Sequence, residues 1–125
     1  MMADKPVEVQ STTSGPIRSL PAKMENNLLR IGQEAITNSL KYARAGRIRI
    51  GVDYQPRSIV LRIHDDGQGF DPRRLPLAED AHFGLLGMRE RAKQMGAQLT
   101  VNSRPGEGTE VLVEAPLGEQ PWPIC

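Results

Sequence analysis

Apolar side chains recur at intervals of three and four residues along residues 24–44. At about 100° per residue these positions fill one broad arc, so the pattern predicts an α-helix whose apolar side is buried. The residues of this arc are Met24, Leu28, Leu29, Ile31, Ala35, Ile36, Leu40 and Ala43. Gly46 follows at a position where a capping glycine is common, so we expect it to cap the helix.

Four shorter segments alternate apolar and polar residues, which is the pattern of half-buried strands. The first two, 48–52 and 59–63, are separated by a proline-containing turn and are expected to pair antiparallel. The other two, 99–101 and 110–113, flank a turn rich in glycine. The sequence therefore predicts two hairpins that close on one sheet.

A second, shorter helix is predicted over about 85–95. Its buried stripe comprises Leu85, Met88, Ala92 and Met95. The preceding residues, 66–83, carry glycines, prolines and charges of both signs. Because a segment of this length without regular structure is uncommon inside a compact domain, we expect a functional loop there.

The order helix, hairpin, loop, helix, hairpin predicts an α+β sandwich with helices on one face of the sheet. We assign residues 23–117 to this domain, which is long enough for one core. Residues 1–22 are rich in proline, serine and threonine and are expected to form an N-terminal tether or an edge strand. Residues 118–125 are expected to form a C-terminal tail.

Composition and charge argue against several classes of partner. The net charge is +1, basic residues are scattered, and aromatic residues make up 4% of the chain. These features argue against binding to nucleic acid and against contact with an anionic membrane. No apolar run approaches the roughly 20 residues that span a bilayer. Since the N-terminus also lacks an apolar signal core, the sequence predicts a cytoplasmic domain.

Glu34, Asn38 and Lys41 lie on one side of the first helix, because spacings of four and three residues place them one turn apart. A carboxylate and an amide oxygen at this spacing can hold a hard cation or its waters, and magnesium prefers oxygen ligands. A lysine one turn further on can meet a phosphate as a point charge. Taken alone, the three residues are more typical of an ordinary solvated helix edge.

The segment Asp65-Asp66-Gly67-Gln68-Gly69 begins where the second strand ends. Gly67 and Gly69 can adopt backbone angles that are closed to other residues, and they allow a ligand to approach the main chain. Asp65, as the last strand residue, can accept a hydrogen bond from the exocyclic amine of a base. The alternative is a turn that only ends the strand.

Gly84 and Gly87 flank the expected start of the second helix. Helix N-termini present free N–H groups and a partial positive charge, which attract phosphate. A plain hinge between loop and helix would use the same glycines. Gly108-Thr109 closes the last turn, where the threonine hydroxyl can reach a ligand or simply complete the turn. Together, and in this order, the four signals supply the parts of a magnesium–nucleotide site.

Four blocks of the sequence resemble the ATP-binding catalytic domain of bacterial sensor histidine kinases, a family grouped with DNA gyrase, the Hsp90 chaperone and the MutL repair protein. The blocks are RIGQEAITNSLKYARA, similar to the N box; HDDGQGF, similar to the first glycine box; FGLLGMRERA, similar to a short second glycine box; and GEGTEV, similar to the last box. The resemblance covers about residues 24–117 and implies the Bergerat ATP-binding fold, a two-layer sandwich with a mixed, mostly antiparallel sheet. The form of the third block is typical of kinases that pair with LuxR/NarL-type response regulators.

The resemblance implies a role for each matching residue. Asn38 is expected to bind magnesium, Glu34 to act beside it on the metal or on water, and Lys41 to contact phosphate. Asp65 is expected to recognise the adenine amino group, and Thr109 to support the adenine end. The other residues expected to line the nucleotide or to let it approach are Tyr42, Gly67, Gly69, Phe70, Gly84, Leu85 and Gly87.

The resemblance also implies that the domain binds ATP and magnesium, closes residues 66–83 over them as a lid, and donates the γ-phosphoryl group to a histidine. In the family that histidine lies on a separate dimerisation domain, which is absent from this sequence, and a response regulator is the further partner. His64 falls in a strand and His82 in the expected lid, so we expect neither to be the phosphoacceptor. The parent protein is expected to be cytoplasmic or anchored in the inner membrane.

Two other functions fit the same residues. The domain can be a nucleotide-binding regulatory module without transferase activity. It can also be an ATPase or a serine kinase that acts on an anti-sigma-type partner. The role of Glu34 stays open between a metal-linked one and an acid–base one.

Overall fold

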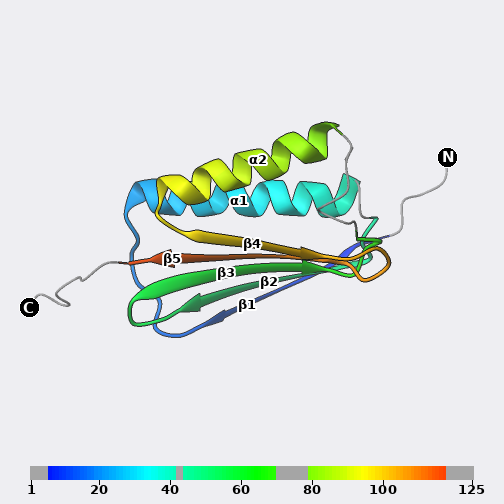
Figure 1. Ribbon diagram of the computed structural model, residues 1–125. Helices are drawn as coiled ribbons and strands as arrows, with labels where there is room; N and C mark the ends of the chain where they lie inside the picture. The colour runs from blue at the N-terminus through cyan, green and yellow to red at the C-terminus, as the bar shows by residue number, and fades with distance from the viewer. Residues whose placement is uncertain (1–5, 42–43, 70–78, 118–125) are drawn as a thin grey trace, which may run out of the picture.

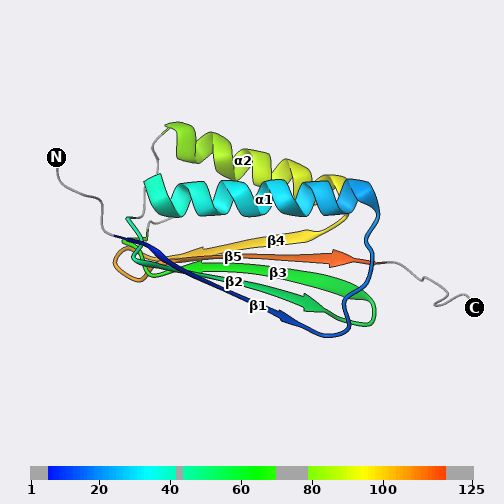
Figure 2. The ribbon, with the colours of Figure 1, turned by 180° about the vertical axis from the view of Figure 1, so that it is seen from behind.

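The computed structural model describes residues 6–41, 44–69 and 79–117, with the backbone alone described for 79–83. In chain order the elements are β1 (Glu8–Ser14), α1 (Ala22–Lys41), β2 (Arg47–Tyr54), β3 (Ser58–Asp65), α2 (Glu79–Gln94), β4 (Gln98–Ser103) and β5 (Thr109–Pro116). Figure 1 shows two layers, a sheet and a pair of helices that lie over one of its faces. The view from behind in Figure 2 shows the same separation of layers.

The described strands form one five-stranded sheet in the order β1-β2-β3-β5-β4. β1 runs parallel to β2, whereas the β2–β3, β3–β5 and β4–β5 pairs are antiparallel. A parallel pair needs a crossover connection, which α1 supplies between β1 and β2. The prediction of an α+β sandwich with a mixed, mostly antiparallel sheet and helices on one face is therefore confirmed. The N-terminal segment contributes β1 as an exposed edge strand.

The core lies between the helices and the face of the sheet that they cover. Every second side chain of a strand points to that face, so Ile59, Leu61 and Ile63 of β3 are buried together. The largest fully buried side chains come from both helices and from two strands and are Ile31, Ile48, Met88 and Val113. Burial of each such side chain stabilises the fold by roughly 1.5–3 kcal/mol, which holds the helices firmly against the sheet.

The topology brings separate parts of the sequence to one end of the molecule. The helices run antiparallel, so the last turn of α1 and the first turns of α2 lie at the same end (Figure 1). β3 ends there and β5 begins there, because Asp65 pairs with Thr109. All four blocks that resemble kinase motifs therefore contribute residues to this end.

The first helix differs from its prediction at its outer side and at its C-terminus. Leu29 and Leu40 were expected in the buried arc, but they are 58% and 49% exposed. They lie about three turns apart on a side of α1 that packs against neither the sheet nor α2, so the expected arc was too broad. The described helix also ends at Lys41 instead of 44, and the left-handed residue after it is Arg44 (φ 53°), not Gly46.

The second helix begins earlier than predicted, at Glu79 instead of about residue 85. Gly84 and Gly87 therefore lie inside α2 and not at its start, and His82 lies on the helix and not in a loop. Glycine lowers helix stability relative to alanine, but Gly84 is accommodated within α2 at the point where Glu34 lies close to it. The rest of the expected lid, 70–78, lies outside the described residues. Among the described residues, no helix is both long and apolar enough to cross a bilayer.

Candidate functional site

Asp65 is a buried carboxylate whose two oxygens are held by different elements. It ends β3 and is 3% exposed. The hydroxyl of Ser39 on α1 donates to Oδ2 at 2.5 Å, and the backbone N–H of Gly67 donates to Oδ1 at 2.9 Å. A carboxylate offers about four acceptor positions, so Asp65 can still accept a hydrogen bond from a ligand.

Glu34 and Asn38 lie against α2 at the point where Gly84 faces them. A Cβ atom on Gly84 would stand 2.7 Å from Glu34 Oε1, and 3.4 and 3.5 Å from the Asn38 side-chain nitrogen and oxygen. The absence of a side chain on Gly84 therefore leaves room for the Glu34 carboxylate between the two helices. A carboxylate and an amide oxygen are thus brought together beneath α2, as the helix spacing predicted. Lys41 is exposed at the last position of α1.

The loop after β3 and the turn between β4 and β5 pack backbone against backbone. Gly69 has φ 66°, and its Cα faces the carbonyl oxygens of Arg104 and Gly108 so closely that a Cβ would clash. Gly108 has φ 78° and lies in the same way against the carbonyl oxygen of Asp65. Gly69 was expected to admit a ligand to the main chain, but in the described structure the neighbouring turn makes this close approach. Gly67 contributes its N–H to Asp65.

Asp66 ties the end of β3 to the connection between α1 and β2. Its Oδ1 accepts hydrogen bonds from the backbone N–H groups of Gly46 at 2.8 Å and Arg47 at 2.9 Å. The backbone hydrogen bonds from Arg47 and then Gly46 lower the pKa of Asp66 below its ordinary value of 3.8. The carboxylate is therefore ionised at neutral pH and fixes the loop that follows the Asn38 helix.

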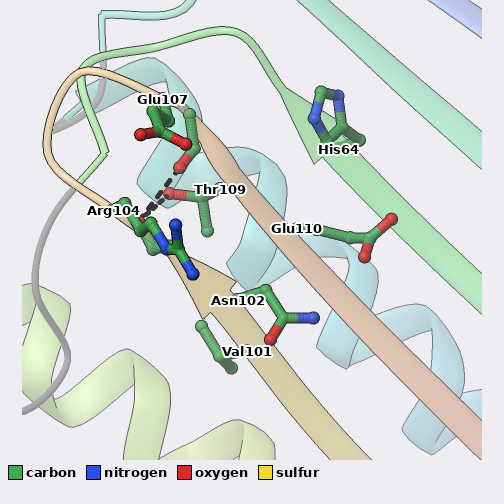
Figure 3. Close-up of a pocket in the computed structure, with 9 residues that line it drawn as sticks. His64, Val101, Asn102, Arg104, Glu107, Thr109 and Glu110 are labelled. Atoms are coloured by element: carbon green, nitrogen blue, oxygen red, sulfur yellow. Dashed lines mark hydrogen bonds between the residues drawn. The ribbon is translucent and has the colours of Figure 1, made fainter.

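Thr109 lies opposite Asp65 in the β3–β5 register, at the edge of a hollow beside the β4–β5 turn. Its hydroxyl lies 2.8 Å from Ser103 Oγ. Figure 3 shows the hollow, whose volume is ≈ 470 Å³, with Thr109 and Arg104 near the turn and His64 on the neighbouring strand. Among the described residues, none of the other site candidates lines this hollow, so it adjoins the Asn38–Asp65 region without containing it.

The structure brings most of the predicted site residues to one end of the fold. Glu34, Asn38 and Lys41 lie along α1, and Asp65 and Thr109 pair across two strands. Gly84, the half-buried Leu85 and Gly87 lie on the neighbouring part of α2. Tyr42 and Phe70 lie outside the described residues.

Sequence reasoning missed two residues that shape this region, Ser39 and Asp66. Ser39 did carry a signal, because it follows Ile31 and Ala35 at intervals of four and is a polar residue in the buried arc. Its partner lies 26 residues away, so the contact itself had no local signature. Asp66 reaches a backbone group 20 residues away, and no spacing in the sequence indicates that contact.

The family follows from a match that covers both helices and four of the described strands, β2 to β5. Residues 24–119 match the family described as histidine kinase-, DNA gyrase B- and HSP90-like ATPases. The chain belongs to this family. The matched range runs from α1 to the end of β5, so it includes every described residue discussed above as a site candidate.

Two curated relatives are named as a histidine-protein kinase/phosphatase and as a sensor protein. The chain is 35% identical over 98 residues to the signal transduction histidine-protein kinase/phosphatase DegS of Bacillus subtilis (strain 168), covering 78% of this chain and 26% of DegS. It is 36% identical over 101 residues to the sensor protein VraS of Staphylococcus saprophyticus, covering 81% of this chain and 28% of VraS. The chain thus spans about a quarter of the length of these relatives.

Two solved structures, one of them a histidine kinase domain, share the fold. The histidine kinase domain of the blue-light activated histidine kinase from Erythrobacter litoralis EL346 aligns with a TM-score of 0.73 at 22% identity, covering 91% of this chain and 53% of that one. Full-length ShkA, solved in complex with AMPPNP, aligns with a TM-score of 0.76 at 22% identity, covering 93% and 27%. These likenesses confirm the two-layer arrangement of the ATPase family.

Proposed function

We propose that this domain binds Mg-ATP and donates the γ-phosphoryl group to a histidine on a separate dimerisation domain of a two-component sensor histidine kinase. The observation that carries the proposal is the gathering of a buried, partly satisfied carboxylate, Asp65, and an oxygen-bearing pair, Glu34 and Asn38, at one end of the sandwich. These are the groups that a purine amine at one end of a nucleotide and a cation at the other end require. Membership of the ATPase family supports the same ligand.

In this proposal Asp65 binds the adenine base of the nucleotide. Its carboxylate is held by Ser39 and Gly67 and keeps acceptor capacity for the adenine amino group. A buried acceptor of this kind discriminates strongly, because a base that offers no donor leaves it unsatisfied. Thr109, across the strand pair from Asp65, supports the same end of the nucleotide.

Asn38 and Glu34 act at the cation. Their amide and carboxylate oxygens are the ligand types that magnesium prefers, and a cation held by so few protein groups keeps waters and phosphate oxygens as its other ligands. Magnesium, when bound, neutralises charge on the phosphate chain. Lys41 adds a positive charge one turn beyond Asn38, and Glu34 works beside Asn38 either through the metal or as an acid–base group.

The phosphoacceptor histidine comes from another domain in this proposal. His64 lies on β3, within a strand, and His82 lies on α2, so neither is on a separate dimerising helix. The relatives DegS and VraS are named as a histidine-protein kinase and a sensor protein, which favours a sensor kinase as the parent and a response regulator of the LuxR/NarL type as the final acceptor. Such a domain works in the cytoplasm.

The test is phosphoryl transfer in trans. The 125-residue chain is mixed with the histidine-bearing dimerisation domain of its parent kinase, magnesium and ATP labelled at the γ-phosphorus. The expected product is label on the partner domain that is lost in acid and kept in base, as for phosphohistidine. Nucleotide binding without label would favour a regulatory module, and label that survives acid but not base would favour a serine kinase. Either result would contradict the proposal.

A further inference from the structure

We infer that Ser39 is a positioning residue for the base, which fixes the Asp65 carboxylate so that it selects the adenine amino group. The inference rests on the proposed function, since it concerns the residue that reads the base. Ser39 lies on α1, next in sequence to Asn38, and its side chain turns toward the sheet instead of toward α2.

The Ser39 hydroxyl is committed to Asp65. Oγ lies 2.5 Å from Asp65 Oδ2 and 3.1 Å from the carbonyl oxygen of Ala35. A hydroxyl has one proton, and the distance to Asp65 is that of a charge-assisted O–H···O⁻ bond, which is the stronger of the two. Both residues are 3% exposed, so water has little access to replace either partner.

Two donors from different elements hold the carboxylate plane. The Gly67 N–H holds Oδ1 and the Ser39 hydroxyl holds Oδ2. The terminal torsion of an aspartate is broad, so with Gly67 alone the carboxylate can rotate about its Cβ–Cγ bond. Rotation moves the remaining acceptor direction of Asp65 away from an adenine amine. Ser39 thereby acts on base selectivity through Asp65, without contact to the nucleotide.

The turn of α1 that carries Ser39 also carries a residue of the cation end of the proposed site. Asn38 and Ser39 are consecutive residues of α1, one facing the cation end and the other the base end. A single turn of helix therefore sets both the amide oxygen and the carboxylate. Loss of the hydroxyl is expected to affect the base end alone, because Asn38 keeps its contacts with α2.

The test compares two nucleotides that differ only at the base. ATP and purine riboside triphosphate, which lacks the 6-amino group, are titrated with magnesium into the full chain and into Ser39→Ala. The wild-type chain is expected to bind ATP more tightly. In Ser39→Ala, ATP binding is expected to weaken about tenfold, the size of one hydrogen bond to a charged group, while binding of the purine analogue changes less than about twofold.

Ser58→Ala is the matched control. Ser58 is also a buried serine that donates to a side-chain oxygen, Gln55 Oε1 at 3.0 Å, but it lies at the opposite end of β3. Its loss is expected to lower stability without changing the ratio of the two affinities. Ser39→Cys, which keeps the shape and has a weaker donor, gives the same comparison should the alanine variant fold poorly.

Three outcomes are decisive. A reduced preference for ATP in Ser39→Ala or Ser39→Cys, with the preference kept in Ser58→Ala, supports the inference. Equal weakening of both nucleotides, or an unchanged ratio, means that Ser39 is only structural and overturns the inference while the proposed function stands. Failure of the wild-type chain to bind ATP at all contradicts the proposed function, and the inference falls with it.

Discussion

Asp65 and Asp66 are adjacent carboxylates with different surroundings and therefore different tasks. Asp65 is buried and is held by one hydroxyl and one backbone N–H, which leaves capacity for a ligand. Asp66 is exposed, and its Oδ1 already accepts two backbone N–H groups from the α1–β2 connection. At the scale of single residues, one carboxylate is thus available to a nucleotide and the other secures the loop beside it.

The lowered pKa of Asp66 predicts a measurable response to acid. A carboxylate whose folded pKa lies below its ordinary value of 3.8 stabilises the fold fully above that value, and this contribution is lost as the pH falls through the folded pKa. Asp66→Asn is therefore expected to lower stability at neutral pH and to reduce the loss of stability on acidification below about pH 4. Thermal unfolding followed from pH 7 to pH 2, at about one-unit steps, measures both effects.

Asp53 supplies the independent comparison. Its pKa is also lowered, by the side-chain hydrogen bond from Gln55 and then by that from Ser14. It lies near the end of β2, away from Asp66, so Asp53→Asn and Asp66→Asn are expected to add in the double variant. An Asp66→Asn protein whose acid sensitivity equals that of the wild type would show that the Gly46 and Arg47 contacts do not act in solution.

At the scale of elements, the decisive feature is how closely α2 lies on α1. Gly84 is buried against Glu34 and Asn38, and Arg91, about two turns further along α2, donates to Asn27 Oδ1 at 3.3 Å. The helix pair therefore covers the oxygen-bearing side of α1 directly. The amide and carboxylate that are proposed to serve a cation are positioned by helix packing and not by a loop.

Gly84→Ala is expected to disturb that packing and with it nucleotide binding. The added methyl group would stand 2.7 Å from Glu34 Oε1, so either the flexible Glu34 side chain must turn away or α2 must lift. The first change moves the Glu34 carboxylate away from Asn38, and the second removes the α2 backbone that packs against both residues. We expect Mg-ATP affinity to fall about tenfold or more and thermal stability to change little when Glu34 moves, as measured by calorimetric titration and thermal unfolding.

Substitution of Gly87 distinguishes an effect on helix packing from an effect on ligand binding. Within the described part of the chain, no atom beyond the adjacent residues and helix backbone lies within 4 Å of a Cβ built on it. Gly87→Ala is therefore expected to stabilise α2 by roughly 0.5–1 kcal/mol, as alanine does in helices. If Gly87 lets a phosphate approach, the same variant binds Mg-ATP more weakly. Gly32→Ala on α1, where the nearest atom is Ile63 Cδ1 at 3.6 Å, is the control and is expected to leave binding unchanged. Unchanged binding in Gly87→Ala would remove that residue from the site.

At the scale of the whole molecule, the β1–α1–β2 crossover and the two hairpins bring the ends of α1 and β3 and the starts of α2 and β5 together (Figure 1). No single motif forms this end of the fold. The loop after β3 and the β4–β5 turn also interlock through Gly69 and Gly108, so the base-reading strand end is supported by the last hairpin. A substitution in one of these segments is therefore expected to disturb the packing of the adjacent segments.

The sequence predicted the elements with strong periodicity and missed the features that depend on contacts. Alternation identified β2, β3, β4 and β5, and the family resemblance was confirmed. The predicted start of α2 was wrong. Glycine is typical of a helix end in sequence, but Gly84 lies within α2, where it packs against Glu34. The roles of Ser39 and Asp66 depend on partners 26 and 20 residues away, which no local pattern encodes. The roles of the candidate site residues stay predictions.

The most direct test of the central claim, that this end of the sandwich binds Mg-ATP, is a calorimetric titration of the wild type, two site variants and one control variant. The wild type is expected to bind, whereas Asn38→Asp and Asp65→Asn are expected to lose binding. Asn38→Asp adds a negative charge beside Glu34 at the phosphate end. Asp65→Asn replaces a carboxylate oxygen with an NH2 donor, which cannot accept a hydrogen bond from the adenine amine. Asp53→Asn, at the far end of β2, is the control and is expected to bind as the wild type does. Wild-type affinity in both Asn38→Asp and Asp65→Asn would contradict the account.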